Sequence, residues 1–122
     1  MEDFKSVYRE IPKLSRAEIE RAIADNDVEA LKIAAISASM YGGDYEWAEN
    51  LCIRLFEHDD VTVRGNAVLS FGHIASVFGA LNEVLVKPII ERALKDPEEY
   101  VRGQAQDAVD DTKWFLKWKY KK

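Results

Sequence analysis

The apolar residues of this chain recur every three to four positions along most of its length, which is the period of an amphipathic α-helix. Alternation with a period of two, which indicates a strand, is nearly absent. The pattern predicts helices at about 16–24, 27–41, 45–57, 60–78, 83–95 and 97–119. The sequence therefore predicts an all-α fold.

Residues that favour helix ends lie beside these segments. Ser15 and Glu18 have the spacing of a capping box ahead of the first helix. Asp44 and Asn82 can cap the helices that follow them. We expect Asp96 to cap the last helix, with a proline at the first helical position. Glycines stop two of the helices: Gly42 and Gly79.

Short connections between helices of this length make neighbours antiparallel, so the helices group as three hairpins at about 16–41, 45–78 and 83–119. The sequence Val-Arg-Gly-x-Ala occurs at 63–67 and again 38 residues later, at 101–105. Both copies lie near the start of the second helix of a hairpin. A two-helix unit with this period is typical of an α-solenoid.

These residues resemble the HEAT repeat family. The second helix of that repeat usually begins with an Asp, followed by Val-Arg five and six residues later and a small residue three beyond the Arg. Asp96, Val101, Arg102 and Ala105 fit this pattern, whereas His58 stands in the place of the Asp in the second hairpin. The resemblance covers about residues 16–119.

The resemblance implies a short right-handed α-solenoid of three HEAT-like hairpins. The length of the chain suits one domain over residues 1–122, which ends in a short basic tail at 117–122. Solenoids of this kind mostly bind other macromolecules.

Arginines near the start of two second helices lie close to the apolar face. On a helical wheel, Arg64 and Arg102 point toward the core, where an arginine needs a hydrogen-bonded partner. For Arg64 that partner could be Asp59, Asp60 or Asp96. We therefore predict that Arg64, Asp96 and Arg102 are structural residues that link successive repeats.

The opposite, polar stripes of the two second helices are the candidate partner-binding surface, because such stripes line the concave side of an α-solenoid. Acids beside exposed aromatic residues are typical of a protein-binding hot spot. For Trp114 and Trp118, packing against the core is the alternative. The candidate residues are Thr62, Asn66, Ser70, His73, Tyr100, Gln104, Asp107, Asp111, Trp114 and Trp118.

The charge of the chain is unevenly distributed. The net charge is −5, but the last ten residues carry five lysines and no acid, which leaves 12 basic and 22 acidic side chains and a net charge of −10 for residues 1–112. An acidic body disfavours nucleic-acid binding and favours a basic protein partner, although acidity can also serve solubility alone. The basic end could bind RNA or a membrane surface, but we favour the reading that its lysines offset the dipole of the last helix.

The sequence predicts no catalytic residue, no cofactor and no metal site. His58 and His73 lie at opposite ends of one predicted helix, roughly 22 Å apart at 1.5 Å per residue. Cys52 lies on an apolar stripe and is expected in the core. Ser70, His73 and Asp111 could imitate a nucleophile–base–acid set, but no oxyanion hole is visible.

The acids of the last helix do not suggest a metal site either. Asp110 points about 100° away from Asp111 on a helical wheel, so the two carboxylates do not converge. Asp107 lies one turn from Asp111, and both could meet one cluster of basic side chains.

The remaining features favour a cytoplasmic protein that binds neither membranes nor nucleic acids. No secretory signal and no run of about 18 apolar residues occurs, and the single cysteine suits a reducing compartment. Small HEAT-like proteins resemble bacterial immunity proteins, which neutralise a co-encoded toxin, often a basic nuclease. We therefore expect a non-enzymatic protein-binding module of this type. A protein-interaction adaptor and a small-ligand or lyase-type HEAT protein are the alternatives.

Overall fold

The protein is all-helical in its computed structural model, which describes residues 11–120. Within this range it has six α-helices and no strand. In chain order they are α2 Arg16–Asp25, α3 Val28–Tyr41, α4 Tyr45–Phe56, α5 Val61–Phe78, α6 Glu83–Ala93 and α7 Glu99–Leu116. Each corresponds to one of the segments predicted from the sequence, which confirms the all-α fold class.

Polar side chains start most of these helices, because the first N–H groups of a helix have no partner within it. Ser15 and Glu18 form the predicted capping box ahead of α2. The side chains of Asp44 and Asn82 accept hydrogen bonds from N–H groups in the first turns of α4 and α6. Gly79 closes α5 with a φ of 66°, where a residue with a Cβ atom is strained.

The start of α7 differs from the prediction, because Asp96 does not cap it. The helix begins at Glu99 rather than at residue 97, and its N-cap residue makes no side-chain capping bond. The Asp96 carboxylate instead pairs with Arg64 and accepts the N–H of Glu98. The ion pair with Arg64 of α5 therefore outweighs the local capping motif at this position.

The end of α7 also comes earlier than predicted, at Leu116 rather than at residue 119. Lys117 adopts the left-handed conformation with a φ of 61°, and the N–H groups of Lys117 and Trp118 both donate to the carbonyl of Thr112. The chain turns here, and Trp118 packs into the core. Part of the predicted basic tail is thus folded against the domain; residues 121–122 lie outside the described range.

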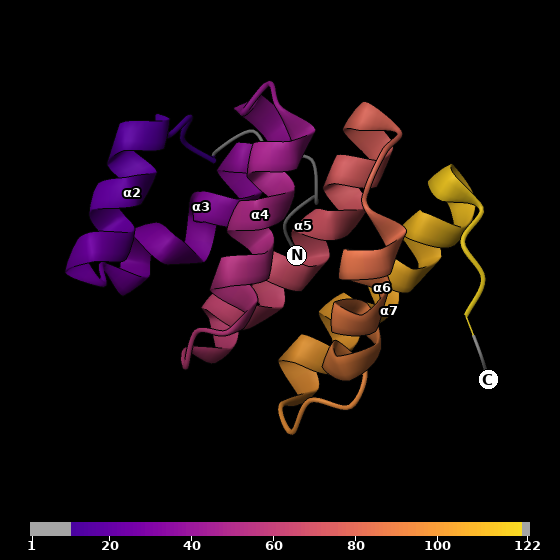
Figure 1. Cartoon of the computed structure of the whole chain (residues 1–122). Helices are drawn as coiled ribbons and strands as arrows, with labels where there is room; N and C mark the ends of the chain where they lie inside the picture. The colour runs from indigo at the N-terminus through magenta and orange to yellow at the C-terminus, as the bar shows by residue number, and fades with distance from the viewer. Residues whose placement is uncertain (1–10, 121–122) are drawn as a thin grey trace.

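The helices pack around α5, which contacts α3 and α7, so these three helices form a row. Helix α4 packs on α3 and α5, α6 packs on α5 and α7, and α2 packs on α3. In Figure 1 this order runs across the molecule, from α2 on one side to α7 on the other. Because helices surround α5, most of its residues are buried.

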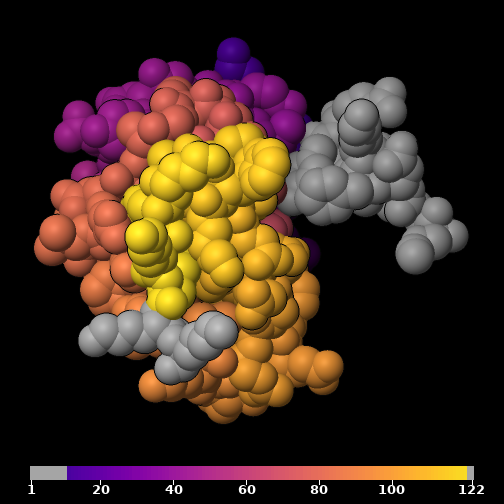
Figure 2. Space-filling model, turned by 90° about the vertical axis from the view of Figure 1, so that its right-hand side faces the viewer, coloured from indigo at the N-terminus to yellow at the C-terminus, as the bar shows by residue number. Residues whose placement is uncertain are grey.

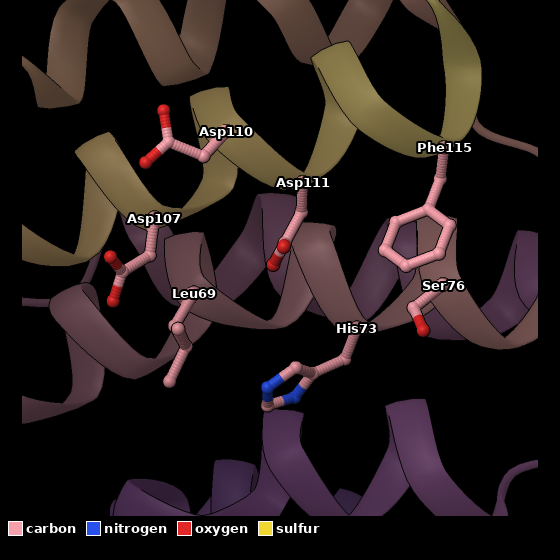
Figure 3. A pocket seen from close by; sticks show the side chains of 7 residues that line it. All are labelled: Leu69, His73, Ser76, Asp107, Asp110, Asp111 and Phe115. Atoms are coloured by element: carbon pink, nitrogen blue, oxygen red, sulfur yellow. The ribbon is translucent and has the colours of Figure 1, made fainter.

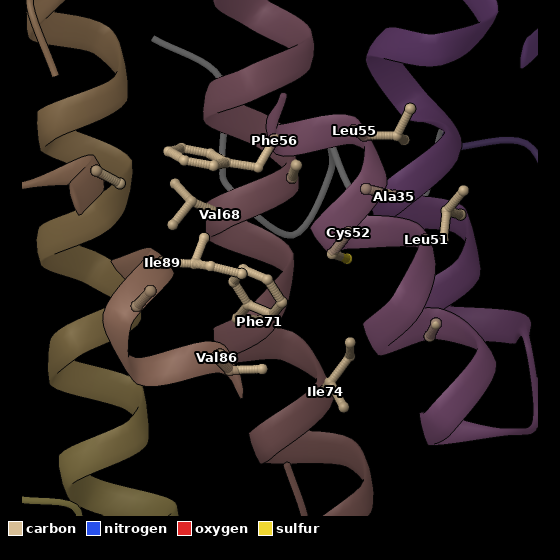
Figure 4. Close-up of a cluster of buried hydrophobic side chains, with 14 of the residues drawn as sticks. Ala35, Leu51, Cys52, Leu55, Phe56, Val68, Phe71, Ile74, Val86 and Ile89 are labelled. Carbon is tan, nitrogen blue, oxygen red and sulfur yellow. The ribbon is translucent and has the colours of Figure 1, made fainter. Parts of the chain in front are cut away.

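The core fills the space between the row and helices α4 and α6 (Figure 4). Phe56, Phe71 and Val86 are among its buried side chains. Cys52 is wholly buried there, as predicted, and burial raises the pKa of its thiol. The thiol therefore stays protonated and packs as a small apolar group.

Two glycines in the middle of α5 let α7 approach it closely. A Cβ atom on Gly65 would lie 2.5 Å from a ring carbon of Tyr100, and one on Gly72 would collide with the carboxylate of Asp111. Each glycine inside a helix costs about 0.5–1 kcal/mol relative to alanine. In return, the two glycines allow α7 to pack closely on α5.

Candidate partner-binding site

An open pocket of about 440 Å³ lies where α5 and α7 meet (Figure 3). Three of the candidate residues predicted from the stripes line it: His73, Asp107 and Asp111. Four other residues of the pocket were missed: Leu69, Ser76, Asp110 and Phe115. Helical spacing could have found most of them, because Leu69 and Ser76 lie four before and three after His73, and Phe115 lies four after Asp111.

Three carboxylates of α7 border this pocket (Figure 3). Asp107 and Asp111 point to the same side of the helix, and Asp110 points away from them, in the arrangement expected from the helical spacing. Asp111 points toward α5 and lies on Gly72. Burial raises the pKa of Asp107, and the charge of Asp110 raises it further. Burial likewise raises the pKa of Asp111, and both neighbouring acids add to this effect. A positive charge close to Asp107 or Asp111 would therefore favour the ionised form of that carboxyl group.

His73 contributes no positive charge to the pocket. Burial lowers its pKa to about 4, so the imidazole is neutral at physiological pH. The hydroxyl of Ser70, one turn before His73, donates to the carbonyl of Asn66 at 2.7 Å. This geometry gives Ser70 a structural partner within its own helix.

Several predicted contact residues instead join the helices of the row. Asn66 donates its side-chain N–H to the carbonyl of Lys32 in α3 at 2.6 Å and accepts a hydrogen bond from the hydroxyl of Tyr100 in α7. Gln104 donates to the same hydroxyl at 3.1 Å. These hydrogen bonds connect α3, α5 and α7.

The prediction that Asn66 and Ser70 face a partner is therefore wrong. Both side chains are buried, with exposed fractions of 8% and 0%. The wheel showed a polar stripe correctly, but α3 and α7 cover it from both sides. Thr62 is half-buried, and Tyr100 remains 44% exposed beside the network.

The two tryptophans, which the sequence could not assign to the core or to a binding surface, differ in exposure. Trp118 is 8% exposed and belongs to the core, so the packing alternative holds for it. Trp114 is 72% exposed on α7. The ammonium of Lys117 lies 5.4 Å from its ring centroid and donates to its carbonyl at 3.0 Å. Of the two tryptophans, Trp114 is therefore the one that a partner can reach.

Of the three acids considered for Arg64, Asp96 is its partner. The guanidinium binds the Asp96 carboxylate through two hydrogen bonds of 3.0 Å, from Nε and Nη2. Its Nη1 donates to the carbonyls of His58 and Asp59. The Arg64 guanidinium lowers the pKa of Asp96. Arg64 of α5 and Asp96, just before α7, therefore join two segments of the chain that lie 32 residues apart.

Arg102 differs from Arg64, and its predicted coreward position is wrong. It is exposed, and its Nη1 donates to the carbonyl of Asp96 at 2.7 Å. His58 takes over part of the missing Asp's role: its Nδ1 accepts the N–H of Asp60 at 2.9 Å, as Asp96 accepts that of Glu98 at 2.9 Å. The two loops thus keep the same bond with different side chains.

Two further findings concern the part of the chain that the structure describes. No group of three or more His, Cys, Asp or Glu side chains there is arranged to hold a metal ion. None of its helices is both long and apolar enough to cross a membrane.

No family model and no curated protein matches this chain. Among solved structures, it is similar to a chain in the crystal structure of a CDI complex from Cupriavidus taiwanensis. The two sequences are 26% identical, and the folds agree with a TM-score of 0.75. The match covers 87% of this chain and 94% of the other, so it extends over nearly the whole of both.

Proposed function

We propose that this chain is the immunity protein of a toxin–immunity pair, which binds its toxin and covers the surface that the toxin needs for its activity. The observation that carries the proposal is the likeness to a chain of a CDI complex over 87% of the present chain. CDI, contact-dependent inhibition, is a toxin–immunity system. A chain that resembles one component of such a complex is a candidate for the same kind of partnership.

Charge favours the immunity side of the pair. Residues 1–112 carry a net charge of −10, and the pocket between α5 and α7 is bordered by Asp107, Asp110 and Asp111. A toxin that acts on nucleic acid needs the opposite sign, because it must bind phosphates. An acidic immunity protein attracts such a toxin and speeds their encounter. The proposed partner is therefore a toxin with a basic surface, such as a nuclease, and the chain itself performs no catalysis.

The arrangement of the helices supports a finer description of the fold, which is also part of the proposal. The contacts of α4 with α5 and of α6 with α7, together with the row α3, α5 and α7, fit a HEAT-like solenoid of three hairpins forming one domain. In such a solenoid the second helices present the binding surface. Asp107, Asp111 and Trp114 on α7 would then contact the toxin, with His73 at the floor of the pocket.

The test is co-expression with the toxin domain encoded by the gene beside this one. We expect the chain to restore growth of cells that express the toxin domain, and to bind the purified domain with an association rate that falls as salt rises. The double variant Asp107→Asn and Asp111→Asn should bind more weakly while remaining folded. A neighbouring gene without a toxin, or a toxin domain that the chain neither binds nor neutralises, would refute the proposal.

A small basic ligand is the second candidate, because the pocket has a suitable size and apolar walls. Its volume of about 440 Å³ lies within the range of small-molecule sites, and Leu69 and Phe115 border the acids. Titration with arginine and with spermidine separates the two functions. Micromolar binding of either, abolished in the double variant and without toxin neutralisation, would favour the ligand.

A further inference from the structure

The repeated Val-Arg-Gly motif places two glycines at equivalent positions of α5 and α7. Gly65 and Gly103 are 38 residues apart, and the same offset relates Gly72 to Asp110. On α5, this face is where the next helix of the row packs: Tyr100 lies on Gly65 and Asp111 lies on Gly72. The α5–α7 contact therefore shows which kind of element this face accommodates, namely a helix.

The equivalent face of α7 has no helix on it within residues 11–120. Nothing in that range lies within 4 Å of a Cβ atom placed on Gly103. Asp107 and Asp110 are exposed on the same face, and Trp114, one turn further, is 72% exposed. In Figure 2 this end of the molecule, formed by α7 and the segment after it, faces the viewer. We call Gly103, Asp107, Asp110 and Trp114 the outer stripe.

We infer that the outer stripe docks an α-helix of the toxin, which continues the row α3, α5, α7 across the interface. Gly103 admits the close approach of a helix backbone or a bulky side chain, as Gly65 does inside the chain. Trp114 supplies an exposed aromatic anchor. The inference rests on the proposed function, since it names the part of the toxin that this chain binds.

Charge determines the chemistry of that helix. In the first three turns of α7 the exposed acids Glu99, Asp107 and Asp110 outweigh the exposed Arg102, so the charge there is net negative. A toxin helix with Arg or Lys side chains along these turns complements them. A second copy of this chain does not, because an antiparallel pairing that sets Trp114 on Gly103 of the other copy would set Asp107 against Asp110. Asp107 also borders the pocket, so the stripe and the pocket are continuous.

The test replaces Gly103, which has no Cβ atom, by a residue with a bulky side chain. Gly103→Leu adds bulk where nothing described lies nearby, so the variant should melt at the same temperature as the parent or higher. The matched control is Ala17→Leu, which adds a similar side chain to an exposed position of α2, a helix that packs on α3 and not on α7. The probe is the purified toxin domain encoded by the neighbouring gene, with affinity measured for each variant.

We expect Gly103→Leu to weaken toxin binding by about tenfold or more, the scale of a contact at an interface centre. Ala17→Leu should leave the affinity unchanged, and Asp110→Asn should slow association. If the parent binds the toxin and Gly103→Leu binds it equally well, the docking inference is wrong and the proposed function stands. If the parent does not bind the toxin domain, the proposed function fails and the inference fails with it. A parent dimer that Gly103→Leu dissociates, with toxin binding unchanged, also overturns the inference in favour of a second copy.

Discussion

Arg64 and Arg102 occupy the same position of the repeated motif, yet we predict very different losses of stability when each is replaced by alanine. Arg64 makes two hydrogen bonds of 3.0 Å to Asp96 and two to backbone carbonyls, and the side chains of the pair are 16% and 8% exposed. Arg102 is exposed and makes one bond, to the carbonyl of Asp96.

The magnitude follows from these contacts. Removing one member of a fully buried ion pair costs about 3–5 kcal/mol, and residual exposure of the Arg64–Asp96 pair reduces this to about 2–3 kcal/mol. An exposed arginine with one hydrogen bond contributes about 1 kcal/mol or less. Arg64→Ala should therefore lower the free energy of unfolding by at least about 1 kcal/mol more than Arg102→Ala does.

Urea unfolding at neutral pH, followed by circular dichroism, measures both losses. Asp96→Asn is the informative background, because the amide oxygen can still accept the N–H of Glu98 while the charge is gone. In that background Arg64→Ala should lose less stability than in the parent. Equal losses for Arg64→Ala and Arg102→Ala, or full losses for Arg64→Ala in the Asp96→Asn background, would refute the assignment of this pair.

The same pair gives a pH dependence of known sign. Arg64 lowers the pKa of Asp96 in the folded state, so the pair stabilises the fold above the unfolded value, near pH 4. That stabilisation is lost as the pH falls through the lower folded value. The difference in stability between the parent and Arg64→Ala should thus shrink below about pH 4.

Three further pairs of outcomes can be measured in the same unfolding assay. Gly65→Ala should destabilise the fold by about 1–3 kcal/mol because its methyl group meets the ring of Tyr100, whereas Gly103→Ala should stabilise it by about 0.5–1 kcal/mol. Asp111→Asn should stabilise the fold by roughly 0.5 kcal/mol at neutral pH, because the raised pKa of Asp111 marks an unfavourable charge, and this gain should vanish below the unfolded pKa of about 3.9. Trp118→Ala should cost about 3 kcal/mol, whereas Trp114→Ala should leave stability within about 0.5 kcal/mol of the parent.

Local signals in the sequence were sufficient for the helices, since their caps and apolar period depend on neighbouring residues. Ser15 and Gly79 act at helix ends as their residue types predict. Only the capping role predicted for Asp96 was wrong, because its carboxylate binds Arg64, which lies 32 residues away. A helix cap and this ion pair compete for the same carboxylate, and only the packed structure shows which contact is made.

The candidate site was predicted in part for a related reason. A helical wheel separates an apolar from a polar face, and two acids that it assigns to the polar face, Asp107 and Asp111, border the pocket. It could not show that α3 and α7 cover the polar face of α5, which buries Asn66 and Ser70. Polar residues on a central helix can therefore have one of two roles: they contact solvent, or they form hydrogen bonds between helices.

The repeated motif itself illustrates how environment decides the role of identical residues. In α5, Arg64 meets Asp96 and Gly65 meets Tyr100, because α7 packs on this helix. In α7, Arg102 and Gly103 have the same sequence neighbours, but Arg102 reaches only a backbone carbonyl and Gly103 meets nothing among the described residues. In α5 the motif forms the surface on which α7 packs. On α7, where no described helix follows, the same surface remains exposed with two acids and a tryptophan beside it, which is why a partner helix is its proposed occupant.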